Sequence, residues 1–294
     1  MTVDRQVFEK NLAARRKKEK IFHGIFAAAT CTGIIMLSIL IADIMTNGIG
    51  HLSWRFLTSY PSRFPEQAGI KSALAGTLWL IVLVTPLTFI IGVGTAIFLE
   101  ELVPKNNPVN RIILANIVNL AGVPSIIYGV LGLAFFVRMM GLGRSILAGA
   151  LTIMLLVLPV VIVSAQEAIR GVPASMRHAS YALGATRWQT VCYVVFPAAL
   201  PGILTGVILA MSRAVGEAAP LIMIGAMAFV AFVPLSPLDH FTVLPIQIFN
   251  WTSRPQEAFH KIAASGIIVL LAVLLSANAL AAYLRDKHQK KSQL

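Results

Sequence analysis

Six long apolar stretches constrain the fold of this 294-residue chain more than any other feature of its sequence. A helix that crosses the hydrocarbon core of a bilayer, ~30 Å thick, needs about 20 mostly apolar residues. Only 12% of the residues are charged, whereas soluble domains carry about 25%. The sequence therefore predicts an all-α, polytopic membrane protein with six transmembrane helices, of which the second, third and fifth are long enough to tilt or protrude. The predicted spans are Ile21–Ile44, Ser72–Leu99, Ile112–Val137, Ile146–Ala165, Pro201–Phe229 and Ile262–Leu284.

Lysine and arginine are distributed unevenly between the two sides of such a bundle. If the N-terminus is cytoplasmic, most of the 24 basic residues fall on the cytoplasmic side, as the positive-inside rule describes. We therefore expect a basic cytoplasmic tail over residues 1–20, a transmembrane domain over residues 21–284 and a second basic cytoplasmic tail over residues 285–294. This topology explains the net charge of +12, so a nucleic-acid partner is not expected.

The loop between the fourth and fifth spans, residues 166–200, is too long and too apolar for a simple connector. Pro173 suits the first turn of a helix, Gly184 suits the position just after a helix, and Thr186 can cap a second helix. The spacing predicts a cytoplasmic helix, a glycine turn and a second helix, with an apolar face that has to pack against something. A soluble partner protein is the candidate.

This loop resembles the EAA loop of the membrane subunits of ATP-binding-cassette importers. Gly184 and Pro197 have the spacing of that family, but the acidic residue of its Glu-Ala-Ala triplet is replaced by His178. The resemblance implies that the loop couples the membrane helices to an ATPase; an unrelated amphipathic re-entrant loop is the alternative. The implied coupling residues are His178, Ala179, Ser180, Ala182, Leu183, Gly184, Ala185, Arg187 and Pro197.

Four further segments are similar to the A-type permease subunits of phosphate importers. They read FLTSYPSRFPEQAGI, AGVPSIIYGVLGLAFF, ALGATRWQT and SRAVGEAAPL. The resemblance implies the type I importer permease fold, in which this chain and a homologous C-type permease form the path for inorganic phosphate. It also implies two copies of an ATP-binding-cassette ATPase, which carry the ATP and Mg²⁺, and an extracytoplasmic phosphate-binding protein. The chain is then expected in the bacterial inner membrane.

Arg213 and Glu217 are the only charged residues between Trp188 and Leu238, and a charge inside a bilayer costs about 2.5–3.5 kcal/mol on insertion scales. Their spacing puts both side chains on one face of a helix, which Pro220 can end. In one interpretation the pair neutralises itself and holds helices together. In the other, Arg213 meets an anion in the path, because a guanidinium offers paired donors that match phosphate oxygens, and Glu217 limits how tightly the anion is held.

Three polar residues of the third span are further candidates for the path: Asn119, Ser125 and Tyr128. Such side chains in membrane helices often only bond to the backbone or to a neighbouring helix. A structural role is therefore the alternative for each of them.

Several features argue against catalysis by this chain. No Walker A pattern occurs, no pair of the six histidines has metal-ligand spacing, and Cys31 and Cys192 form no motif. We expect no enzyme activity, cofactor or metal here. A permease for another solute or oxyanion, and a stand-alone secondary transporter, remain the alternative functions. A membrane-embedded enzyme would need clustered acidic residues or histidines. The four acidic residues near span ends lie apart from one another: Asp43, Glu100, Glu101 and Glu167.

Overall fold

The computed structural model describes residues 2–104, 107–227 and 229–292, and nearly all of this part of the chain is helical. Five of its helical segments are long and apolar enough to cross a membrane, and a bent pair of shorter helices provides a sixth span if it is counted as one. The predicted all-α, multi-span fold is therefore confirmed. The five segments are α1 (Thr2–Gly48), α3 (Lys71–Ile97) with the π-turn η3 (Phe98–Leu102), α6 (Ile146–Arg170), the run of α8 (Arg187–Thr190), η5 (Val191–Val195) and α9 (Phe196–Val215), and α12 (Glu257–Ser292).

Helix α6 is the centre of the bundle and the most deeply buried of these segments. It packs against both α3 and α9. Glycines permit both contacts: a Cβ added at Gly92 would lie 2.8 Å from Val161, and one at Gly206 would lie 2.4 Å from Ser164. Without a hydrophobic driving force between helices in lipid, such close packing is what holds membrane helices together.

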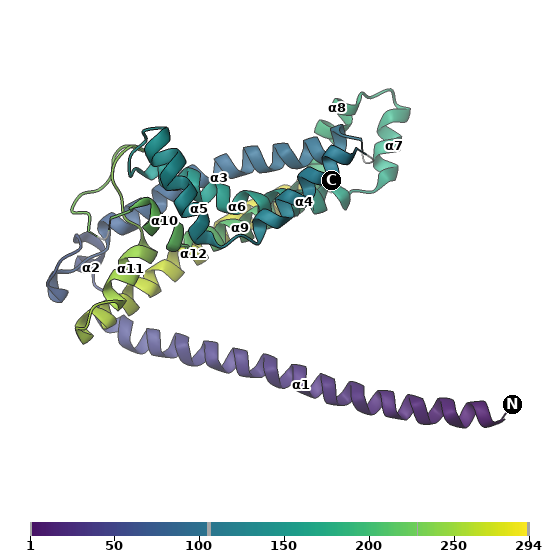
Figure 1. Ribbon diagram of the computed structural model, residues 1–294, viewed down its shortest axis with the longest axis horizontal. Helices are drawn as coiled ribbons and strands as arrows, with labels where there is room; N and C mark the ends of the chain where they lie inside the picture. The colour runs from purple at the N-terminus through teal and green to yellow at the C-terminus, as the bar shows by residue number, and fades with distance from the viewer. Residues whose placement is uncertain (1, 105–106, 228, 293–294) are drawn as a thin grey trace.

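Helix α1 diverges from the rest of the bundle (Figure 1). It contacts α12 only near its C-terminal end, where the Ser265 hydroxyl donates to the Gly48 carbonyl at 2.7 Å. The large apolar side chains from Ile21 to Ile41 are exposed. A surface of this kind is stable only in lipid or against another membrane protein.

The third span is not one continuous helix, so the prediction for Ile112–Val137 is wrong in this respect. Helix α4 (Pro108–Ala121) and helix α5 (Ser125–Gly132), which continues into the π-turn η4 (Leu133–Met139), meet at an angle of 103°. The bend follows from Pro124, which has no N–H for a helix and disfavours helical geometry in the residue before it.

The fifth predicted span, Pro201–Phe229, is also divided differently. Helix α9 ends at Val215, a short helix α10 (Ala219–Ile224) follows with Pro220 in its first turn, and Gly225, with φ of 86°, ends α10. At the other end, α8, η5 and α9 form one uninterrupted helical run, so the predicted second loop helix is the first part of the fifth span. The wider π-turn η5 lies just before Pro197 and accommodates its missing N–H.

The two ends of the bundle carry different elements, and they are the α7 end and the α11 end. The α7 end carries α7 (Ala174–Ala182), and the α11 end carries α11 (Leu244–Thr252) together with η1 (Ile49–His51), α2 (Trp54–Thr58) and η2 (Pro65–Gln67). A separate apolar core stabilises the α11 end, with the Phe56 and Trp251 rings 6.0 Å apart. In the loop before α11, the N–H groups of Ser236 and Leu235 donate to Asp239 and lower the pKa of its carboxyl.

Candidate functional site

Arg213 lies in the last turn of α9, and Glu217 lies in the break between α9 and α10. The Arg213 Nε and Glu217 Oε1 atoms are 3.6 Å apart, which is too long for a hydrogen bond. The Arg213 side chain is 59% exposed and that of Glu217 is 19% exposed. In the part of the chain that the structure describes, the Arg213 guanidinium donates no hydrogen bond to a protein group, so its donors remain available.

A cavity of about 160 Å³ lies between α6 and α9 beside Arg213. Apart from the guanidinium, its polar side chain is Ser164 of α6, which a sequence pattern could not distinguish from a serine that only bonds its own helix. The cavity is lined by Leu156, Val157, Val160, Ser164, Gly206, Leu209, Ala210 and Arg213. An arginine and a hydroxyl in an otherwise apolar wall are suited to a small anion.

A larger groove of about 570 Å³ lies on another face of α9, against α3 and α12. Its walls are almost entirely apolar, and its main polar feature is the bond from the Ser212 hydroxyl to the Asn278 side-chain oxygen, at 2.7 Å. Because no charged side chain among the described residues lines it, this groove is a poor candidate for an anion path.

The three polar candidates of the third span lie at or near the bend between α4 and α5. Asn119 is exposed, Ser125 is half-buried, and none of the three lines the cavity beside Arg213. The Tyr128 hydroxyl donates to the Leu120 carbonyl at 2.8 Å and so satisfies an acceptor freed by the bend. This bond favours a structural role for Tyr128, while a path role for Asn119 and Ser125 stays a prediction.

The predicted helix, glycine turn and second helix are all present between α6 and α9. Helix α7 follows Pro173, Gly184 has a φ of 83°, and the Thr186 side chain caps α8 in a capping box with Gln189. Positive φ is the conformation in which glycine is favoured. The Ser180 and Thr190 hydroxyls are 2.9 Å apart and connect α7 to the helix that follows.

Most of the coupling residues implied by the resemblance are on the surface of this segment. Leu183 at the turn is 89% exposed, and neighbouring Trp188 is 61% exposed. Large apolar side chains displayed next to a loop mark a surface for another protein. The exposed members are His178, Ala179, Ala182, Leu183, Gly184, Arg187 and Pro197, while Ser180 and Ala185 are half-buried.

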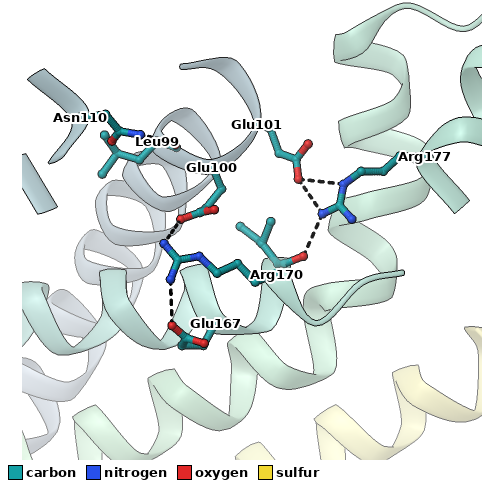
Figure 2. Close-up of polar contacts among 8 residues, drawn as sticks. Leu99, Glu100, Glu101, Asn110, Glu167, Arg170 and Arg177 are labelled. Carbon is teal, nitrogen blue, oxygen red and sulfur yellow. Dashed lines mark hydrogen bonds and ion pairs between the residues drawn. The ribbon is translucent and has the colours of Figure 1, made fainter. Parts of the chain in front are cut away.

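The expectation that the acidic residues of the span ends lie apart is wrong for three of them. Glu100 and Glu101, in η3, face two arginines of the α6–α7 segment (Figure 2). Arg170 of α6 forms ion pairs with Glu100 and, at 3.1 Å, with Glu167, while Arg177 of α7 pairs with Glu101 at 2.7 Å. The only sequence signal for this network was that these glutamates and arginines lie near span ends that were predicted to be on the same side of the membrane.

Arg177 makes further contacts besides this ion pair. Its Nη1 donates to the Val172 carbonyl at 2.6 Å, and its Nη2 donates to the Ile169 carbonyl at 2.9 Å. Its Nε donates to Glu101 at 3.2 Å. All three nitrogens of the guanidinium are therefore engaged, and each acceptor lies outside α7.

Comparisons with known proteins agree with this architecture. Residues 90–289 match the family described as "binding-protein-dependent transport system inner membrane component". The probable ABC transporter permease protein YqgI of Bacillus subtilis is 34% identical over 94% of this chain and 98% of its own length. The phosphate transport system permease protein PstA 1 of Mycobacterium tuberculosis is 31% identical over 98% of this chain and 94% of its own length.

Solved structures share the fold. A bacterial ABC transporter involved in alginate import matches with a TM-score of 0.66 and 15% identity, over 94% of this chain and 99% of its own. The MetNI methionine ABC transporter, in an inward-facing conformation, matches with a TM-score of 0.58 and 20% identity, over 73% of this chain and 92% of its own. With these matches and its bundle of membrane helices, the chain belongs to the binding-protein-dependent transport system inner membrane component family and is a permease subunit of an ATP-binding-cassette importer.

Proposed function

We propose that this permease carries inorganic phosphate, and that Arg213 holds the anion during its passage. The observation that carries the proposal is the Arg213 guanidinium, which donates no hydrogen bond within the described part of the chain and lies beside the cavity between α6 and α9. The names of two relatives support the choice of phosphate. One is the Mycobacterium tuberculosis protein, and the other is a probable phosphate transport system permease protein of Methanocaldococcus jannaschii, 31% identical over 91% of this chain.

The chemistry of the site suits a tetrahedral oxyanion. A guanidinium presents two parallel N–H donors, and hydrogen bonds between charged partners are short and strong. Ser164 adds a hydroxyl in the same cavity. The Glu217 carboxylate lies 3.6 Å from Arg213 and competes with the anion for the guanidinium. This competition weakens the binding of the anion, so that it can leave the site.

In this proposal both termini and the α7 end are cytoplasmic. The excess of basic residues in the two tails and in the 166–200 loop supports this orientation. In Figure 1, α1 begins and α12 ends toward the end of the molecule that carries α7, as the orientation requires.

The exposed surface around Leu183 and Trp188 then contacts an ATPase subunit. Two such subunits bind and hydrolyse ATP with Mg²⁺, a second homologous permease completes the path within the bilayer, and an external phosphate-binding protein docks on the α11 end. An importer for another oxyanion is the alternative, because Arg213 provides charge and paired donors but no selectivity between anions of similar shape.

The test is uptake of radiolabelled phosphate by the complete importer in proteoliposomes. Arg213→Gln is expected to lower uptake by about tenfold or more, since a hydrogen bond to a charged group contributes about 1.5–3 kcal/mol. The matched control is Ser212→Ala, one residue away and facing α12 through Asn278. Normal uptake by Arg213→Gln would refute the role of Arg213, and a verified wild-type complex that transports sulfate but not phosphate would refute the substrate.

A further inference from the structure

We propose that Arg177 is a positioning residue that fastens α7 to the adjoining ends of α3 and α6, so that these helices move together when the ATPases close. The inference rests on the ATPase contact proposed above for the surface around Leu183 and Trp188, which adjoins α7. Arg177 touches neither the cavity nor the exposed surface at Leu183. Its role is to transmit motion between them.

The acceptors of Arg177 define what it connects. Glu101 belongs to η3 at the end of α3, Ile169 belongs to the last turn of α6, and Val172 lies between α6 and α7. A rotation of α7 about Gly171 that left α3 and α6 in place would break the bonds to Glu101 and Ile169. The Arg177 side chain is 18% exposed, so water cannot easily replace these partners.

The C-terminal end of α6 explains why the Arg177 guanidinium lies there. The last carbonyls of a helix have no partner within the helix and form the negative end of its dipole. Arg177 supplies donors and a positive charge to Ile169 and to the carbonyl of Val172 that follows α6. Without it, α7 would remain joined to α6 through residues 171–173, where Gly171 permits pivoting.

The π-turn η3 brings several elements to one point, which Figure 2 shows. The Val103 N–H donates to the Phe98 carbonyl at 3.1 Å, the bond that defines a π-turn. The side-chain amide of Asn110 in α4 donates to the Leu99 carbonyl at 3.2 Å. With Glu100 bound to α6 and Glu101 bound to α7, η3 is a junction of four helices.

Both glutamate side chains of this junction are largely shielded from solvent: Glu100 is 8% exposed and Glu101 is 9% exposed. A buried carboxylate is strongly unfavourable without its cation. The junction is therefore stable as a unit, and α7 is held in one orientation relative to α3 and α6. Because α6 also forms a wall of the cavity beside Arg213, movement of α7 shifts that wall against α9.

The primary test removes both charges of the pair at once. The double variant Glu101→Gln/Arg177→Gln leaves no unpaired buried charge, so the complex is expected to assemble and hydrolyse ATP. Phosphate transported per ATP hydrolysed should fall by about fivefold or more, the usual size of a coupling effect. The matched control is Glu167→Gln, which removes an exposed carboxylate from the same network and should keep the wild-type ratio.

A second measurement reports on the connection without transport. Spin labels at Ser175→Cys in α7 and Phe98→Cys in η3, with Cys31 and Cys192 replaced by serine, give the distance between the two elements in the assembled complex. Both labelled positions are exposed. The distance distribution should broaden in the double variant and stay narrow in Glu167→Gln, and this readout holds whichever anion is transported.

A wild-type transport ratio and a narrow distance distribution in the double variant would overturn the proposal. Failure of the double variant to assemble would also contradict it, because the charges would then serve folding instead of coupling. The docking role of α7 is tested separately by Leu183→Asp. If this variant retains its ATPase subunits, the proposed coupling surface is wrong, whatever the result for Arg177.

Discussion

Arg177 and Arg213 each lie within reach of a glutamate, yet their guanidinium groups are used in opposite ways. All three nitrogens of Arg177 donate to protein acceptors, and its side chain is 18% exposed. Arg213 is 59% exposed and has only a loose contact with Glu217 at 3.6 Å. An arginine with every nitrogen engaged connects parts of the protein, whereas one with free donors in an apolar helix is available to a ligand.

Replacing each arginine by methionine should affect the stability of the complex very differently, and this is the largest expected difference between the two. Arg177→Met leaves Glu101 buried without a cation, and we expect a loss of about 3–5 kcal/mol. Arg213→Met removes a largely exposed charge whose contact with Glu217 is loose, so the thermal unfolding temperature of the complex should change little. Both variants are compared by thermal unfolding in nanodiscs, and equal losses of stability would remove the distinction.

Arg213→Lys separates charge from geometry at the cavity. Lysine keeps the positive charge but loses the planar paired donors, so phosphate uptake should fall by about tenfold while stability is retained. Initial rates of uptake over a range of phosphate concentrations give the measurement. If lysine supported the full rate, a positive charge alone would be enough at this position.

Glu217→Gln should have a smaller effect on the same transport assay. Without the competing carboxylate, Arg213 holds the anion more tightly, so the apparent KM should decrease and the maximal rate should fall. The change is expected to be no more than about fivefold, since partly exposed ion pairs contribute about 0.2–1 kcal/mol. A higher KM would mean that Glu217 helps to bind the anion.

Asp239 is a third kind of charged group, held mainly by backbone donors, and its removal is expected to have the smallest effect. The N–H groups of Ser236 and Leu235 lower the pKa of its carboxyl. The stabilisation of this loop is therefore present above the ordinary carboxyl pKa, about 3.9, and is lost as the pH falls through the lowered value. Amide hydrogen exchange should show protected Leu235 and Ser236 amides at neutral pH and less protection in Asp239→Asn; equal protection would exclude the carboxylate as the cause.

Local patterns in the sequence predicted most of the fold. Hydropathy located the membrane-crossing segments, and Pro173, Gly184 and Thr186 predicted the helix–turn–helix because each acts on its own neighbours. The 103° bend was missed because length and hydropathy do not report direction, although Pro124 provided the signal. The unbroken passage from α8 into α9 was missed because a proline usually ends a helix, and η5 prevents this at Pro197.

The candidate site was predicted less completely. Arg213 and Glu217 were evident because a charge in an apolar run is rare. The pairing of Glu101 with Arg177 joins residues 76 positions apart, and no local pattern specifies such a contact. Ser164 was missed because only the fold brings it to the cavity that Arg213 also lines, where Gly206 permits α6 and α9 to meet.

The continuous helical run from Arg187 to Val215 has a geometric consequence for transport. Its 29 residues extend over about 43 Å at ~1.5 Å per residue, with the turn at Gly184 beyond one end and Arg213 near the other. When such a run moves as one body, a small change in its angle at one end displaces the other end. A tilt of about 4° at the turn would displace Arg213 by about 3 Å, the length of a single hydrogen bond.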